Sequence, residues 1–132
     1  RTLGTNVSLF DVSDLAAPAS LDRQNLGSNS HSEAEYDHHA FFFDPASGLL
    51  VIGLELYGER PSQSFAGAVG MRVDATGVEE IARIFHPASG GDSALPISRT
   101  LLSGGRLYTL SEQGLMAHDP ATRANQAFLE FD

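Results

Sequence analysis

The sequence lacks cysteine, tryptophan and lysine altogether among its 132 residues. Without cysteine the chain can form no disulfide, no thiolate metal site and no cysteine nucleophile. Its only permanent cations are eight arginines, which face 17 Asp and Glu residues and leave a formal net charge of -9. Because this excess of negative charge would repel a phosphate backbone, we expect no binding to nucleic acid.

Long apolar runs are also missing. No stretch reaches the roughly 18 uninterrupted apolar residues of a membrane-spanning helix, so we expect no membrane insertion by this segment. The chain opens at Arg1, and the charged and apolar regions of a secretion signal do not follow. We therefore expect a processed or trimmed chain, whose export signal would lie upstream.

What the sequence does contain is a series of short runs rich in Val, Ile, Leu, Phe and Tyr, separated by clusters of Gly, Pro, Asp and Ser. This pattern is typical of β-strands joined by turns, and stretches with helical periodicity are nearly absent. We predict an all-β chain with ten strands, at 7–12, 19–26, 39–44, 49–56, 67–74, 78–85, 97–102, 106–111, 115–118 and 126–131.

Two kinds of hairpin alternate along the chain. In one kind Asp11, Asp74 or Asp119 stands where the first strand ends, and an aspartate there can accept backbone N–H bonds and close the turn. The other kind is more apolar, as in HAFFFDPASGLLVIGLEL and ISRTLLSGGRLYTLS. One hairpin of each kind makes a repeat of four strands, which is typical of a β-propeller blade.

The predicted fold is therefore a partial β-propeller of four-stranded antiparallel blades, with a β-sandwich as the alternative. Residues 1–132 would be part of one propeller domain, in which 1–27 form the outer half of a blade, 38–86 a second blade and 95–132 a third. Neighbouring blades cover both faces of a blade, so we predict that most phenylalanines lie in the core: Phe41, Phe42, Phe43, Phe85, Phe128 and Phe131. Closed propellers typically have four to eight blades, and we expect the remaining ones to come from the same protein or from other subunits.

Three segments in order carry a resemblance to a known family: NVSLFDVSDLAAPASLD, SEAEYDHHAFFFDPASGLLVIGLELYG and LLSGGRLYTLSEQGLMAHDPATR. Together they resemble a bacterial and archaeal family of secreted β-propeller proteins that is distantly similar to WD repeats. The sequence departs from the family at His39, where the family often has Lys. The resemblance implies a propeller domain in an extracellular or envelope-attached protein, and it implies no reaction.

The polar stretch before the strand at 39–44 has two readings. In the structural reading, Tyr36, Asp37 and His38 pin the loop that joins two blades, with His38 bonded to an Asp or Ser of a neighbouring turn. In the functional reading, Asp37 and His39 bind a divalent metal ion, for which carboxylate and imidazole are suitable ligands. If this segment is extended, His38 and His39 point to opposite faces, and a single site can use only one of them.

These observations favour a non-enzymatic scaffold or binding module that presents its loops to a protein, peptide or glycan partner. We assign no catalytic residue and expect no cofactor, apart from the divalent metal considered above. Two alternatives stay open. One is a metal-dependent enzyme site in the propeller loops around 37–39, and the other is a structural subunit of a larger assembly.

Overall fold

The structure is a computed structural model that describes residues 4–87, 95–120 and 125–131. In this part of the chain, strands are joined by tight turns and by three single turns of 3-10 helix. The strands are β1 (Asn6–Asp11), β2 (Ala19–Asn25), β3 (Ser30–His31), β4 (Phe41–Asp44), β5 (Leu49–Leu56), β6 (Phe65–Asp74), β7 (Gly77–Ile84), β8 (Arg99–Ser103), β9 (Arg106–Leu110), β10 (Gly114–His118) and β11 (Asn125–Glu130). The helical turns are η1 (Glu33–Glu35), η2 (His38–Ala40) and η3 (Pro61–Gln63).

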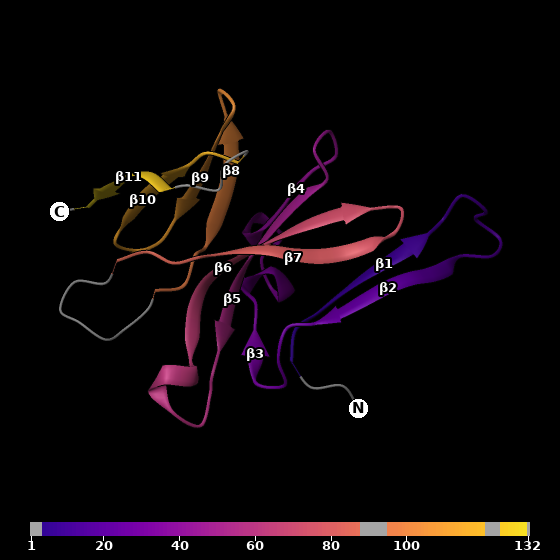
Figure 1. Cartoon of the computed structure of the whole chain (residues 1–132), viewed down its shortest axis with the longest axis horizontal. Helices are drawn as coiled ribbons and strands as arrows, with labels where there is room; N and C mark the ends of the chain where they lie inside the picture. The colour runs from indigo at the N-terminus through magenta and orange to yellow at the C-terminus, as the bar shows by residue number, and fades with distance from the viewer. Residues whose placement is uncertain (1–3, 88–94, 121–124, 132) are drawn as a thin grey trace.

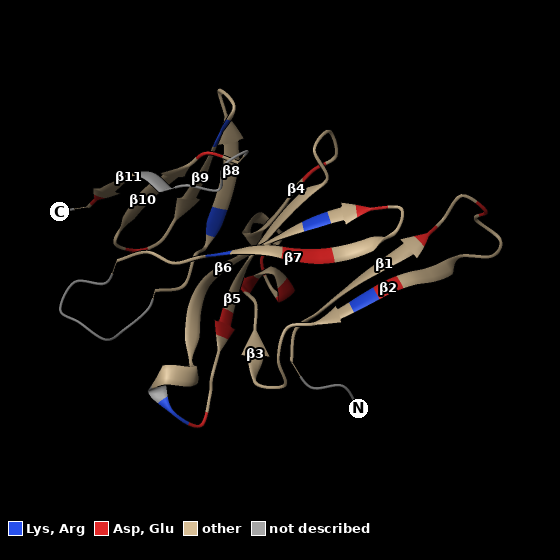
Figure 2. Cartoon of the chain, viewed as in Figure 1, with Lys and Arg blue, Asp and Glu red and all other residues tan. Residues whose placement is uncertain are grey.

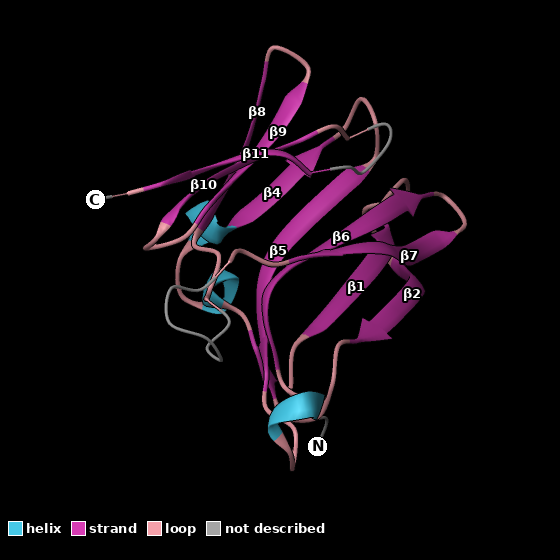
Figure 3. Cartoon of the chain, turned by 60° about the vertical axis from the view of Figure 1, so that its left-hand side comes forward, coloured by secondary structure: helices cyan, strands magenta, loops and turns pink. Residues whose placement is uncertain are grey.

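The strands form three antiparallel sheets that stand side by side, with the largest in the middle (Figures 1 and 3). The first sheet is the β1–β2 hairpin. The middle sheet has the order β3-β5-β6-β7, and β4 pairs with the start of β5 while β3 pairs with its end. The third sheet has the order β11-β10-β9-β8. The all-β prediction is confirmed, and three sheets in a row differ from the two facing sheets of a sandwich.

Both faces of the middle sheet are covered at β5. The sequence of this strand, LLVIGLEL, fits that position because it is apolar without alternation. On one face, Ile52 belongs to an apolar cluster that reaches Val7 and Leu9 of the first sheet. On the other face, Val51 packs in a second cluster with Leu107 of the third sheet. The neighbouring strand β6 contributes to both clusters, so the core lies on either side of β5 and β6.

The prediction that the phenylalanines fill the core is wrong for most of them. Exposed fractions are 51% for Phe41, 43% for Phe43, 63% for Phe85 and 46% for Phe131, while Phe42 packs against the second cluster. Phe41 and Phe43 alternate with Phe42 along β4 and therefore point to the other face. On that face the described part of the first sheet consists of only two strands, and it leaves both rings partly uncovered.

Charged residues are spread over all three sheets (Figure 2). Acidic side chains recur in the hairpin turns, as Asp11 and Asp74 do at the ends of β1 and β6. Among the described residues, no helix is long and apolar enough to cross a membrane.

Candidate functional site

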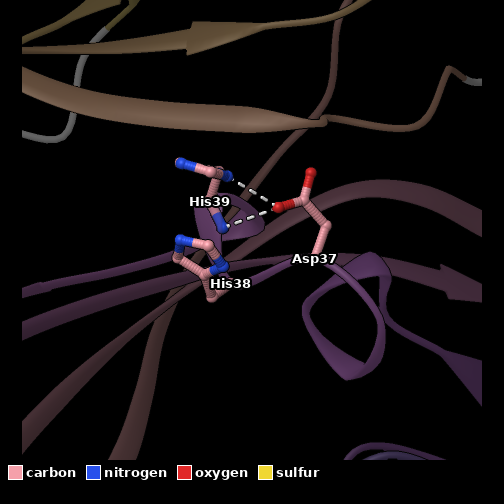
Figure 4. A group of neighbouring side chains, drawn as sticks. All are labelled: Asp37, His38 and His39. Atoms are coloured by element: carbon pink, nitrogen blue, oxygen red, sulfur yellow. Dashed lines mark hydrogen bonds and ion pairs between the residues drawn. The ribbon is translucent and has the colours of Figure 1, made fainter.

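The candidate site is the turn Asp37–His38–His39, which leads into β4 (Figure 4). Asp37 caps η2: its Oδ1 accepts the backbone N–H of His39 at 2.9 Å. This cap makes the backbone turn helically instead of extending. The imidazoles of His38 and His39 consequently stack, with ring centroids 3.9 Å apart and planes inclined by 36°. The expectation that they point to opposite faces is wrong, because it assumed an extended strand.

The Asp37 carboxylate is held by His39 of the same turn and by Arg99 of the third sheet. Its Oδ1 also bonds Nδ1 of His39 at 2.9 Å, and its Oδ2 accepts a bond from the guanidinium of Arg99 on β8 at 2.8 Å. The backbone N–H of His39, then its ring, then Arg99 hold the pKa of Asp37 well below its usual range. Asp37 is therefore ionised at neutral pH, and its ion pair with Arg99 links the middle and third sheets.

The three residues of this turn could hold a metal ion. One ligand atom from each of Asp37, His38 and His39 can be chosen so that all lie within 4.8 Å of one another. The side chain of His39 is 60% exposed and that of Asp37 31%, so an ion could reach them from solvent. Arg99 already occupies one carboxylate oxygen, and its charge opposes a bound cation.

Ser32 and Glu35 hold the loop that precedes this turn. Tyr36 is 87% exposed and His38 is exposed as well, while the backbone N–H of Tyr36 closes η1. Buried Ser32 instead donates its hydroxyl to the Gly53 carbonyl of β5 at 2.6 Å. Ser32 also forms a capping box with Glu35 at the start of η1. The loop is thus anchored one helical turn earlier in the sequence than Tyr36 and His38.

The repeated aspartates lie in the hairpin turns. Oδ1 of Asp11 accepts the backbone N–H of Ser13 at 2.8 Å, and Oδ1 of Asp74 accepts that of Thr76 at 2.7 Å. The Ser13 N–H lowers the pKa of Asp11, and the Thr76 hydroxyl together with its N–H lowers that of Asp74. Asp119 directly follows β10 and is half-buried, and residues 121–124 of its turn lie outside the described part of the chain.

A model of the family described as "Beta propeller domain" matches residues 1–123. The chain belongs to this family. No curated protein and no solved structure matches the chain. A propeller blade is a four-stranded antiparallel sheet, and both β4–β7 and β8–β11 are sheets of this kind.

The propeller also contains a buried polar network that the sequence did not reveal. His86, which follows β7, bonds the Ser111 hydroxyl through Nδ1 at 2.7 Å and the Thr109 hydroxyl through Nε2 at 2.8 Å. Thr109 in turn bonds Nε2 of His118 at 2.9 Å, and all four residues are at most 3% exposed. Burial, and to a lesser degree His118, lower the pKa of His86 to about 4. The sequence signal was the two-residue spacing of Thr109, in β9, and Ser111, which directly follows that strand.

Asp22 joins the first two sheets of the propeller. Its Oδ2 accepts the backbone N–H of Val78 on β7 at 2.8 Å, across 56 residues of sequence. That N–H, followed by the N–H of Arg23 and the Gln24 side chain, lowers the pKa of Asp22. Gly77 lies directly beside it, since a Cβ at this position would come within 2.6 Å of Asp22 Oδ2.

A groove of about 400 Å³ opens between the first sheet and the inner part of the middle sheet. Apolar side chains from both sheets line most of it, and Asn6, Ser8 and Glu35 supply polar groups. The apolar lining is Val7, Leu9, Ala34, Phe41, Phe43, Leu50, Ile52, Val73 and Val78. Consecutive residues of β1 take part, although successive side chains of a strand point to opposite faces. The edge of β1 therefore faces the groove.

Proposed function

We propose that this propeller is a non-enzymatic scaffold or binding module of an exported or envelope-associated protein, and that it binds a protein, peptide or glycan partner. The observation that carries the proposal is the groove beside β1. Phe41 and Phe43 line it while remaining 51% and 43% exposed. Concave apolar surfaces with a few polar groups are where ligands and partners usually bind.

The edge of β1 favours an extended peptide among these partners. Within the described residues, β1 pairs with β2 alone, and consecutive residues of β1 line the groove. An extended peptide can add to such an edge and place alternate side chains against the apolar wall. Phe43 and Ile52 would contact those side chains.

A peptide display library and a glycan array, screened against the purified chain, test this proposal. Phe43→Ser should abolish binding of the selected ligands, because it removes an aromatic contact within the groove. Phe85→Ser is the matched control, since Phe85 is 63% exposed and is absent from the groove lining. Equal loss in both variants, or no selected ligand at all, would contradict a groove-based binding function.

A structural role in a larger assembly is the second candidate, and the outer face of the third sheet favours it. On this face Leu101 is 46% exposed and Leu129 is 63% exposed. Register places Leu101 beside Tyr108, and Leu129 beside Leu115, which makes the face largely apolar. Another blade of the same protein, or another subunit, would bury it.

Sedimentation of the isolated chain tests this second role. We expect self-association that weakens in Leu129→Ser and persists in Phe85→Ser. A soluble monomer with a cooperative unfolding transition would instead indicate that the chain needs no further blade.

A metal-dependent enzyme site is the third candidate, and the convergence of Asp37, His38 and His39 favours it. Metal analysis of protein purified without a His tag tests it. Stoichiometric metal that is lost in His39→Ala, together with a hydrolytic activity lost in the same variant, would support it over the scaffold role.

Export is tested by cell fractionation of the source organism. We expect the protein in the medium, the periplasm or the envelope fraction. Recovery in the cytoplasmic fraction alone would contradict this part of the proposal.

A further inference from the structure

The stacked imidazoles of η2 have an arrangement that suits a metal ion. Asp37 Oδ1 bonds Nδ1 of His39 at 2.9 Å, which leaves Nε2 as the ring nitrogen available to a ligand. A carboxylate behind one nitrogen of a histidine, with metal at the other, is the usual outer-shell arrangement of metal-binding histidines. The ring of His38 lies directly against that of His39, with 3.9 Å between centroids, so a second imidazole stands beside the first.

We propose that His38 and His39 bind one first-row transition metal ion through their imidazole nitrogens, and that Asp37 orients His39 by a hydrogen bond. The inference concerns binding alone, and it depends on neither the groove nor an enzymatic role. One candidate ligand atom from each of Asp37, His38 and His39 can be chosen so that the three lie within 4.8 Å of one another. Two metal–nitrogen bonds of about 2.1 Å span about 4 Å at most, so a small rotation of one exposed ring brings the nitrogens into range.

The sequence predicted Asp37 as a direct metal ligand, and its role in this proposal is different. Its oxygens already accept bonds from the backbone and ring of His39 and from Arg99. A carboxylate engaged in this way is a poor direct ligand, although it can still fix the ring that carries the metal. The site therefore offers imidazole rather than oxygen ligands, which favours Zn²⁺, Cu²⁺ and Ni²⁺ over Mg²⁺ and Ca²⁺.

Arg99 sets a limit on the affinity. Its guanidinium lies 2.8 Å from Asp37 and places a positive charge next to the site. Like charges repel, so Arg99 weakens the binding of any dication nearby. Arg99→Gln removes this charge and also frees Oδ2 of Asp37, and both changes should tighten metal binding.

The test is a Zn²⁺ titration of the full chain, made without a His tag, by isothermal calorimetry. We expect one Zn²⁺ per chain, at least tenfold weaker binding in His38→Ala and in His39→Ala, and no change in His31→Ala. His31 is the matched control because it is an exposed histidine outside the cluster. Arg99→Gln should bind Zn²⁺ several-fold more tightly, and Asp37→Asn about tenfold more weakly.

A spectroscopic measurement identifies the ligands directly. The electron paramagnetic resonance spectrum of the Cu²⁺-loaded chain should show coupling to two nitrogens, and to one nitrogen in either histidine variant. Circular dichroism of each variant checks that the fold is intact. Absence of saturable Zn²⁺ binding, equal weakening in His31→Ala and His39→Ala, or a Cu²⁺ spectrum unaltered by His38→Ala would each overturn the proposal.

Discussion

The contact between the first and middle sheets differs from the contact between the middle and third sheets in what is buried. The first contact is mostly apolar, formed by the cluster Leu26, Leu50, Ile52, Leu54, Val69, Met71 and Val78, with the bond from the Val78 N–H to Asp22 as its polar part. In the second contact, the smaller cluster Val51, Ala68, Ile97 and Leu107 shares the space with the network of His86, Thr109, Ser111 and His118. An apolar contact gains stability in proportion to buried area, whereas a buried polar network also requires every partner to be present.

The difference arises at corresponding positions of two similar hairpins. Ile52 lies four residues after the turn glycine Gly48, and Thr109 lies four after Gly105 (52 minus 48, 109 minus 105). Leu54 and Ser111 correspond in the same way, each six residues after the turn. Equivalent positions of the two hairpins therefore carry aliphatic side chains in the middle sheet and hydroxyl side chains in the third sheet. Sequence differences at two positions per hairpin are enough to change the chemistry of a whole contact.

The largest expected effect on stability comes from shortening a buried side chain in the apolar contact. Leu54 is 2% exposed, and Leu54→Ala should lower the free energy of unfolding by about 2–5 kcal/mol, because it removes buried methyl groups and leaves a cavity. Urea denaturation measures the change. Leu101→Ala is the control: Leu101 is 46% exposed, so its loss should cost less than about 1 kcal/mol. Similar losses in both variants would mean that the first contact is not tightly packed.

The second-largest effect is expected from acid, which should weaken the polar contact between the middle and third sheets. The pKa of His86 is lowered from 6.5 to about 4, so between these values the unfolded chain binds a proton that the folded chain does not. Its contribution to stability is complete above pH 6.5 and falls by about 3 kcal/mol in total as the pH drops towards 4. The carboxylates with lowered pKa values lose their contribution mainly below pH 3.8, where the unfolded chain takes up protons that the folded chain does not.

Urea unfolding at a series of pH values measures this acid effect. It should disappear in His86→Gln and persist in His39→Ala, whose ring is exposed. An unchanged pH dependence in His86→Gln would show that another group is responsible.

Removing a single hydroxyl should have a smaller effect on the same contact. Thr109 bonds both His86 and His118, so Thr109→Val keeps the shape of the side chain and leaves two ring nitrogens without this partner. The expected loss is about 2 kcal/mol, because a buried polar group without a partner keeps its desolvation cost. Thr100→Val on β8, directly opposite Thr109 in register, is the control and should be nearly neutral. Thermal unfolding of the two variants side by side separates these outcomes.

The smallest effect is expected at the ion pair between the middle and third sheets. Arg99→Gln removes the bond to Asp37, but both side chains are partly exposed, at 41% and 31%. Exposed pairs contribute little and are screened by salt. The midpoint of thermal unfolding should fall slightly at low ionic strength and match that of the unaltered chain at high salt. A large loss that salt does not reduce would show that the pair acts as a buried one.

Local sequence patterns predicted most of the strands. All ten predicted strands are present, and the bounds of β5 are those expected. Turn residues and unbroken apolar runs act within a few residues, which is why they can be read directly. The two-residue strand β3 and the turns η1 and η2 were missed, because short capped turns look like loops. The missed cap at Asp37 also caused the error about the orientation of His38 and His39.

Long-range contacts could not be read in this way. His86 meets Thr109 and Ser111 across 23 and 25 residues, and Asp22 meets Val78 across 56. Nothing in the local pattern of either partner specifies the other. Phe41 and Phe43 failed as core residues for a related reason, since their burial depends on what covers β4 from the adjacent side and not on β4 itself.

Gly53 allows two connections of the chain to approach the backbone of β5 closely. The carbonyl of Gly53 accepts the Ser32 hydroxyl, and a Cβ at this position would come within 2.3 Å of the Ile97 carbonyl. The connections that lead into two successive blades therefore both contact the backbone at Gly53, where no side chain intervenes. A side chain at position 53 would clash with the Ile97 carbonyl, so the connection that leads into the third sheet would have to move away from β5.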